Sequence, residues 1–504
     1  MIFGILILIL LAILAYIYYT LRKRYNYWQS VGIACEKPTF VLGNITGTGS
    51  RRSFAEIWQT FYDKYKNTGP FAGFYWFFKP AAFVFDPALL KLILIKDFSK
   101  FVDRGIFVNE KDDPLSGNLF NLEGNKWRHM RTKLSPTFTS GKMKIMFPII
   151  TDISKEFVKV FDNAVKESEV LEVSDLMARF TTDVIGTCAF GLEISSLKDP
   201  NNKFRMMGRK SLLEQRYGNL GIAFRNSFPN LARKLHMKDT LQDVEDFFMG
   251  IVKETVRYRE ENNIKRNDFM NMLIEMKNNK LMKSETGEEM TTLSIEEVAA
   301  QAFVFLVAGF ETSSTTMGFA LYELAQRQEI QQRAREEIIE VLEKHNQEFS
   351  YEAMKEMVYL EQVLLETLRL HAIVPILNRY AEEDYPVPGH PNFVIKKGML
   401  VLIPAAAIHR DERYYPNPNE FNPDHFTPEK VAQRDSVLYI PFGDGPRICI
   451  GMRFGKMQAL VGLAVLLKNF KFSVCDKTQI PLKYDKKNFL LSAEKGVYLK
   501  VTKL

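Results

Sequence analysis

Residues 441–451 restrict the possible folds of this chain more than any other stretch. They place a lone thiol, Cys449, among glycines, one phenylalanine and one arginine. Apolar residues at helical spacing follow directly over 452–470, so the thiol is expected at the N-terminus of a helix. Unpaired N–H groups and the helix dipole favour a thiolate there. A thiolate held by backbone donors beneath a planar ligand is what a haem-thiolate site requires.

The glycines of this stretch support the same interpretation, because they allow a tight turn and a close approach of the helix to a flat group. The alternative is a free cysteine that acts as a small buried hydrophobe. The number of matched positions argues against it, because the stretch resembles the haem-binding signature of the cytochrome P-450 monooxygenases at every defined position: Phe442-Gly443-x-Gly445-x-Arg447-x-Cys449-x-Gly451. The resemblance implies haem b as cofactor and Cys449 as the axial ligand of its iron. It also implies haem contacts from Phe442, Arg447 and Gly451.

Size and composition limit the alternatives. The chain has 504 residues, 46% hydrophobic and 25% charged, and no linker or repeat divides it, so one large domain is expected. Its 4 cysteines form no CxxC pair, which argues against a zinc site and a disulfide scaffold and for a reducing compartment. The net charge of +7 is spread along the chain. No nucleic-acid partner is therefore expected, whereas a membrane surface or an acidic protein fits.

The N-terminus carries an uncharged run, residues 2–19, rich in Ile and Leu. As a helix, a run of this length just spans a bilayer core of roughly 30 Å. Basic residues follow at 22–24, and the positive-inside rule keeps that end in the cytosol. A cleaved signal peptide is the alternative, but its charge would precede the apolar run and small residues would follow it. We therefore predict a retained anchor, and a connector in which Tyr27 and Trp28 suit a headgroup interface.

The fold class follows from the balance of patterns. Helical periodicity dominates, and short aromatic or β-branched runs such as 82–85 predict strands. The chain is expected to be mainly α with a minor β part (α+β). By resemblance this is the cytochrome P-450 fold, a single large helical domain with small β-sheets behind an N-terminal transmembrane helix. The predicted parts are an anchor at 1–21, a connector at 22–44 and a haem-thiolate catalytic domain at 45–504.

A long buried helix is predicted from Ser294 to about Gln326. Ser294 as N-cap and Glu297 three residues later form a capping box. The middle of the helix is apolar nearly all round, so it should be buried on all sides. Within it, the stretch 308–312 contains a glycine, an acid and a threonine, each of which is costly in a core helix.

That stretch, Ala308-Gly309-Phe310-Glu311-Thr312, resembles the family's oxygen-activation motif. Gly309 permits close approach of a flat ligand, and the Thr312 hydroxyl can bond a carbonyl of the preceding turn. The resemblance implies that Glu311 and Thr312 relay protons through water toward the haem iron, with Ala308 beside the haem. A core helix with a back-bonded threonine and a glutamate at its exposed edge is the alternative.

Trp127 and Arg131 stand at i and i+4 on one face of a helix predicted over 124–134. In the resembled family such a pair binds a haem propionate, and an arginine makes a strong charge-assisted contact with a carboxylate. By the same resemblance, Arg379 and Arg447 also hold the propionates. A tryptophan packed on the core beside an exposed arginine is the alternative.

Glu366 and Arg369 stand at i and i+3 among apolar residues, which predicts a partly buried pair. The alternative is a surface pair worth about a few tenths of a kcal/mol. In the family an arginine completes this structural network. His425 occupies that position here, so the network is expected to be weaker or pH-sensitive.

The resemblance implies an apolar pocket for a lipophilic substrate beside the haem. A lid is expected within 203–266, where an ordinary amphipathic helix pair is an equally compatible interpretation. The expected pocket walls are Phe107, Phe120, Phe303, Ala308, Val374, Leu377 and Leu490.

The implied reaction is insertion of one oxygen atom of O2 into a lipophilic small molecule, either a xenobiotic such as a plant toxin or insecticide or an endogenous lipid or hormone. Segments 101–105, 113–117 and 136–142 are similar to the insect microsomal branch of the family, which implies the endoplasmic reticulum membrane with the catalytic domain on its cytosolic side. Two alternatives remain open: a peroxide-rearranging haem-thiolate enzyme that needs no reductase, and a non-enzymatic haem-binding sensor. Thr312 beside an acid argues against the first.

Electrons are expected from a separate protein, because the chain shows no Gly-rich nucleotide fingerprint in a strand–helix setting. The implied partner is an NADPH-dependent flavoprotein reductase, with cytochrome b5 as a further candidate. Lys133, Arg453 and Lys456 are candidates for the docking surface, and ordinary solvated charges are the alternative for each of them.

Overall fold

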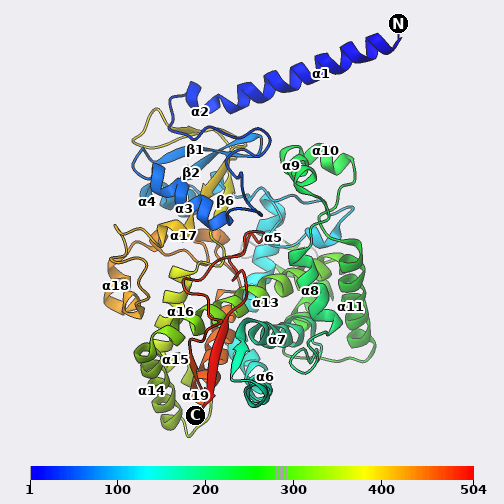
Figure 1. Ribbon diagram of the computed structural model, residues 1–504. Coiled ribbons are helices and arrows are strands. Elements are labelled where there is room, and N and C mark those ends of the chain that lie inside the picture. Colours follow the sequence, from blue (N-terminus) through cyan, green and yellow to red (C-terminus); the bar gives the residue numbers. More distant parts are fainter. Residues whose placement is uncertain (1, 279–281, 284–288, 291) are drawn as a thin grey trace.

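The computed structural model describes residues 2–278, 282–283, 289–290 and 292–504 (Figure 1). Helices predominate in this part of the chain, which confirms the predicted α+β class. The helices are α1 (Ile2–Tyr25), α2 (Tyr27–Ser30), α3 (Phe54–Tyr65), α4 (Pro87–Lys91), α5 (Gly124–Leu134), α6 (Ser140–Glu167), α7 (Val173–Ile185), α8 (Lys203–Leu213), α9 (Asn219–Ser227), α10 (Pro229–Lys234), α11 (Gln242–Glu261), α12 (Phe269–Asn278), α13 (Ile295–Gln326), α14 (Gln328–Lys344), α15 (Tyr351–Glu356), α16 (Val358–Leu370), α17 (Ala405–Ile408), α18 (Pro428–Gln433) and α19 (Met452–Asn469).

The strands form small sheets. One sheet has the order β1-β2-β9-β6, in which β2 and β9 are parallel and the other pairs antiparallel. A second, antiparallel sheet has the order β10-β11-β3, and β4-β5 and β7-β8 are two-stranded. The strands are β1 (Phe71–Trp76), β2 (Lys79–Val84), β3 (Val170–Glu172), β4 (Met282–Lys283), β5 (Glu289–Met290), β6 (Leu377–Tyr380), β7 (Tyr385–Pro386), β8 (Val394–Ile395), β9 (Leu400–Ile403), β10 (Phe470–Ser473) and β11 (Tyr498–Lys503).

Buried apolar side chains form two clusters. The larger lies among the helices that surround α13, and the smaller joins the four-stranded sheet to α3. The stretch 441–451 lies where the two clusters meet, because Ile440 belongs to the smaller cluster and Phe442 packs against the larger. The sheet and the helices therefore each bury one face, and the cysteine loop lies between these two packed units.

Helix α13 crosses the helical part of the molecule (Figure 1). Its predicted capping box is confirmed: the Ser294 hydroxyl accepts the Glu297 N–H, and the Glu297 carboxylate accepts the Ser294 N–H. Among the described residues, α13 is also the helix that is long and apolar enough to cross a membrane. Because 61% of its most apolar window is buried inside the protein, α13 is a core helix.

The N-terminal helix α1 extends away from the body of the molecule (Figure 1). It continues to Tyr25, past the predicted boundary at residue 21, and apolar side chains such as Phe3 and Leu8 are 77% and 67% exposed. The prediction for Trp28 was wrong. Trp28 is fully buried, its Nε1 donates to the Phe74 carbonyl at 3.0 Å, and its ring fills the space above Gly73. The tryptophan therefore belongs to the smaller core, because the sheet offers it a hydrogen bond and a side-chain-free surface.

Candidate functional site

The loop that carries Cys449 is shaped by its glycines. Gly445 has φ +69°, and a Cβ atom there would lie 1.8 Å from the Leu94 carbonyl oxygen, so only glycine fits. Gly443 has φ +75°. The loop closes through a hydrogen bond from the Cys449 N–H to the Phe442 carbonyl at 2.8 Å, and α19 begins at Met452. The predicted turn and helix are thus confirmed.

The Cys449 thiol lies deep inside the protein and yet is accessible. Burial raises its pKa, although a hydrogen bond from the Gly451 N–H and the charges of Arg104 and Arg131 act in the opposite direction. The residue itself is exposed. Both observations hold if the sulfur faces an open space within the molecule. The backbone donor expected at this helix end is therefore present, and a cation on the sulfur would add to its effect against the desolvation of the thiolate.

Helix α13 provides an opposing surface. Ala308 is exposed in the middle of this otherwise mostly buried helix. The Thr312 hydroxyl, also exposed, donates to the Ala308 carbonyl at 2.6 Å, as predicted. Gly309 has a different role from the one predicted, since a Cβ atom there would lie 2.4 Å from Cδ1 of Ile185. The glycine therefore allows α7 to pack against α13.

Side-chain donors reach every carbonyl of the motif at 308–312. Gln458 of α19 donates its Nε2 to the Gly309 carbonyl at 2.7 Å and so joins the helix behind Cys449 to α13. The other four carbonyls each accept a hydrogen bond from a side-chain hydroxyl: Ala308 from Thr312 at 2.6 Å, Phe310 from Thr181 at 2.9 Å, Glu311 from Ser314 at 3.1 Å and Thr312 from Thr316 at 2.7 Å. These bonds fix the motif within an unbroken α-helix.

Glu311 occupies the acidic position of the motif. Burial raises the pKa of its carboxyl group, and the positive charges of Arg209 and Arg205 on α8 oppose that rise. The carboxyl therefore holds a proton to a higher pH than an exposed glutamate does. A group with a raised pKa of this kind is a candidate for proton transfer.

A group of arginines lies near the same interior space. Arg379 is 2% exposed, donates to the Asn378 carbonyl at 2.7 Å, and its buried Nε has no partner. Burial, together with nearby positive charges, lowers the pKa of Arg104, Arg379 and Arg447 to about 10, 9 and 8. All three stay charged at neutral pH. A cluster of buried cations with an unsatisfied donor fits a ligand that brings carboxylates, such as haem b with its two propionates.

The arginines do not share one role. The Arg447 guanidinium donates to the Val102 and Leu122 carbonyls at 3.0 and 2.8 Å, and it lies 4.0 Å from the centre of the Trp127 ring. Arg447 and Trp127 thus hold each other and the loop before α5, and the predicted contact of Arg447 with a propionate stays a prediction. Arg131, on α5 as predicted, donates to the Ile448 carbonyl at 2.9 Å beside Cys449.

Arg104 was missed by sequence reasoning. It donates to the carbonyls of Phe120 and Arg447 at 2.9 and 3.2 Å, and its charge acts on the Cys449 thiol. No local signal marks it, because it stands in a loop without periodicity. Only the fold brings residue 104 next to residue 449.

The predicted scaffold network is present. Arg369 donates to both Glu366 oxygens at 2.7 and 2.8 Å, and both side chains are fully buried. Arg369 also donates to the carbonyls of His409, Pro418 and Glu420. His425 lies where the prediction placed it, with Nδ1 at 3.2 Å from Glu366 Oε1, a longer contact than those of Arg369. The alternative of a surface pair was wrong.

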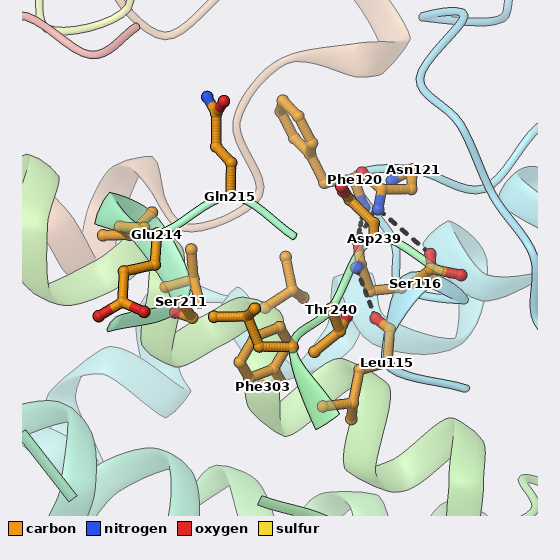
Figure 2. A pocket seen from close by; sticks show the side chains of 15 residues that line it. Leu115, Ser116, Phe120, Asn121, Ser211, Glu214, Gln215, Asp239, Thr240 and Phe303 are labelled. Atoms are coloured by element: carbon orange, nitrogen blue, oxygen red, sulfur yellow. Dashed lines mark hydrogen bonds between the residues drawn. The ribbon is translucent and has the colours of Figure 1, made fainter. Parts of the chain in front are cut away.

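A cavity of about 300 Å³ lies between α13, α8 and the loops around residues 118 and 240 (Figure 2). In the view, Phe120 lies on the upper side of the cavity and Phe303 of α13 on its lower side. Both are among the residues predicted for the substrate pocket, and polar side chains such as Asn118 and Thr240 line the same cavity. The lining residues are Leu115, Ser116, Asn118, Phe120, Asn121, Ser211, Leu212, Glu214, Gln215, Asp239, Thr240, Leu241, Phe303, Val304 and Val307.

The other predicted wall residues lie outside this lining. The Phe107 ring packs beneath Arg225, 5.3 Å from its guanidinium. Leu377 faces the cysteine loop: a Cβ atom added to Gly443 would lie 4.0 Å from Leu377 Cδ1. Leu490 packs partly buried on the helical core, and the next residue bonds to Ile373, one residue before Val374. Ala308 follows Val307 of the lining on α13 and is exposed.

Comparison with known proteins bears on this arrangement. The sequence model of the cytochrome P-450 family matches residues 34–501. The chain belongs to the cytochrome P-450 family. Its relatives include cytochrome P-450 6a9 of Drosophila melanogaster, 60% identical over 503 residues that cover all of both chains. Cytochrome P-450 6A1 of Musca domestica is 48% identical over 503 residues, 99% of this chain and 98% of the relative.

The predicted family and its insect branch are thereby confirmed, and the protein is a P-450 monooxygenase. Membership of the family implies haem as cofactor. The loop geometry, the accessible sulfur and the unsatisfied arginine donor all fit that group.

Proposed function

We propose that this P-450 oxidises a lipophilic small molecule, a xenobiotic or an endogenous lipid or hormone, with electrons from an NADPH-dependent reductase. The observation that carries the proposal is the accessible Cys449 sulfur, which faces an internal space although the surrounding protein buries it. When bound there, haem supplies the redox-active iron at which O2 is activated. The peroxide-rearranging alternative would require no reductase.

Each site residue has a role within that proposal. Cys449 holds the haem iron, and Phe442 and Gly451 border the haem from the loop. Arg379 and Arg131 neutralise the propionates, joined by Arg104. Trp127 and Arg447 position the loop that carries Arg104.

Glu311 and Thr312 handle protons. Burial raises the pKa of the Glu311 carboxyl, so this group holds a proton more readily than an exposed glutamate and can pass it on. The exposed Thr312 hydroxyl, bonded to the Ala308 carbonyl, lies where a water molecule can reach it. These two residues pass a proton toward the bound haem.

The cavity beside α13 takes the substrate. Phe120, Phe303 and Val307 offer apolar contact, whereas polar side chains such as Asn118 and Thr240 line the same space. Such a mixed lining suits a lipophilic molecule that carries at least one hydrogen-bonding group. Glu214 and Asp239 also line the cavity, and Asp239 forms an ion pair with Arg225.

The exposed apolar surface of α1, with Arg22, Lys23 and Arg24 in its last turn, supports a membrane anchor with a cytosolic catalytic domain in the endoplasmic reticulum. The reductase, or cytochrome b5, would dock near the cysteine loop. Arg453 is a candidate contact there. Lys456 is a weaker one, because it pairs with Glu361, and Lys133 is a buried side chain.

The test uses the full chain with Cys449→Ser as the variant. The reduced carbon monoxide complex of the wild type should show the spectrum of a thiolate-ligated haem, and C449S should lose it. A retained thiolate spectrum in C449S would show that another residue binds the iron. Product formation from lipophilic compounds should require the reductase and NADPH. Turnover with a hydroperoxide alone, and none with reductase, would favour the peroxide-rearranging alternative.

A further inference from the structure

One wall of the cavity is a self-bonded loop, residues 115–121. Five of its residues line the cavity. Asn118 organises the loop: its Nδ2 donates to the Leu115 carbonyl at 2.9 Å, and its Oδ1 accepts the Phe120 and Asn121 N–H groups at 3.1 and 3.2 Å. The loop is therefore expected to move as one unit.

Among the described residues, the side chain of Gln301 hydrogen-bonds this loop to α13, against which the loop also packs. The Gln301 Oε1 accepts the Leu119 N–H at 2.8 Å, and the Gln301 Nε2 donates to the Gly117 carbonyl at 3.2 Å. Gln301 is fully buried. An amide in an apolar core is costly unless both of its ends are bonded, and here both bonds go to the loop.

The position of Gln301 on α13 relates it to the cavity. Residues at i, i+3 and i+7 share one face of a helix, so Gln301, Val304 and Ala308 form one stripe. Val304 lines the cavity and Ala308 is exposed. Along one face of α13, the loop contact is therefore followed by the cavity lining and then by the motif at 308–312.

The opposite side of the loop is held by the arginines. Arg104 donates to the Phe120 carbonyl at 2.9 Å and lies 4.3 Å from the centre of the Phe120 ring. Arg104 therefore fixes the loop on the haem side, and Gln301 fixes it on the α13 side. The buried side chains of Leu115 and Leu119 pack the loop on the helical core, and the two hydrogen bonds of Gln301 set its register against α13.

We propose that Gln301 is a positioning residue that sets the width of the substrate cavity and thereby limits the size of the molecules that enter. It acts through main-chain atoms of the loop and does not itself line the cavity. Because this role concerns the cavity, it rests on the function proposed above.

The test compares Gln301→Met with Gln326→Met in the full-length holoprotein. Gln326 is on the same helix, but its Nε2 donates to the Tyr322 carbonyl of α13 itself, so it is a matched control. In Q301M, hydrogen exchange of the Leu119 amide should be roughly fivefold to tenfold faster, because one hydrogen bond of ordinary strength is lost. In Q326M, Leu119 exchange should match the wild type.

A second measurement reads the cavity itself. Straight-chain 1-alkylimidazoles bind haem iron through nitrogen, and the chain then occupies the space above it. The affinity for each alkylimidazole is measured by spectral titration. The ratio of the affinity for long chains to that for short chains should be several-fold higher in Q301M than in the wild type. Gln301→Glu keeps the acceptor for Leu119 and loses the donor for Gly117. Its Leu119 exchange rate and its chain-length preference should therefore lie between those of the wild type and Q301M. This variant replaces Q301M in both measurements if Q301M does not fold.

Wild-type exchange at Leu119, or an unchanged chain-length preference in a folded variant, would overturn the proposal. The assignment of the cavity to substrates fails by a different result. If no alkylimidazole chain alters affinity in the wild type, the cavity is not the substrate site, even where Leu119 exchange follows Gln301.

Discussion

Acid should destabilise this protein through one buried histidine. His409 is fully buried, its Nε2 accepts the Ile440 N–H at 2.9 Å, and Ile440 directly precedes the cysteine loop. Burial, and then the charges of Arg369 and Arg434, lower the pKa of His409 to about 3. Its pKa in the unfolded chain is about 6.5. The imidazole is therefore neutral in the folded protein at pH 5 and charged in the unfolded chain.

The sign follows from proton binding. Where the unfolded chain binds more protons than the folded one, stability falls as the pH falls. Between pH 7 and pH 5, with an unfolded pKa of about 6.5 and a folded pKa well below 5, His409 alone removes about 2 kcal/mol. That loss is a large fraction of the roughly 5–15 kcal/mol by which domains are stable.

The assay is urea unfolding of the full chain in detergent at pH 7 and pH 5, followed by tryptophan fluorescence. His409→Gln offers Ile440 an amide oxygen and removes the titrating group, so its loss of stability between the two pH values should be smaller by about 2 kcal/mol. His390→Gln, at an exposed position, is the control and should keep the wild-type pH dependence. An H409Q protein with the wild-type pH dependence would refute the assignment of a buried neutral imidazole.

Three further predictions concern the site and its scaffold. Glu366→Ala should lower the free energy of unfolding by about 3–5 kcal/mol, because it leaves the buried Arg369 without its anion. His425→Phe should lower it by about 1 kcal/mol. Equal shifts in the thermal midpoints of the two variants would contradict the contacts described for Glu366. Thr312→Ala should retain haem but release several-fold more hydrogen peroxide per NADPH, and unchanged coupling would remove the hydroxyl from proton transfer. Arg379→Leu should lose haem to a scavenging apoprotein roughly tenfold faster, since one charge-assisted contact is gone; wild-type transfer rates would exclude contact with a propionate.

Local patterns were sufficient for much of the fold. The capping box at Ser294 and the apolar run behind it give the start and length of α13 within one residue. Gly443 and Gly445 have positive φ angles, which favour glycine, so the tight turn could be predicted from the residue types alone. The spacing of Glu366 and Arg369 placed the pair on one helix face, and the adjacent apolar residues indicated their burial.

Contacts between distant segments could not be read from the sequence. Gly309 lies against Ile185, Trp28 lies above Gly73, and Phe107 packs beneath an arginine of α9. Each residue has the chemistry that the pattern suggested, but its neighbour comes from a segment at least 40 positions away. Arg104 illustrates the limit, because nothing in its own stretch separates a site arginine from a surface arginine.

The bond between Gln458 and Gly309 ties two helices of the site together. One end belongs to α19, which begins three residues after Cys449, and the other is a carbonyl of the motif at 308–312 on α13. The helix behind the thiol and the helix that carries Glu311 and Thr312 are therefore joined by the chain's own atoms, so a substitution that displaces one helix is transmitted to the other.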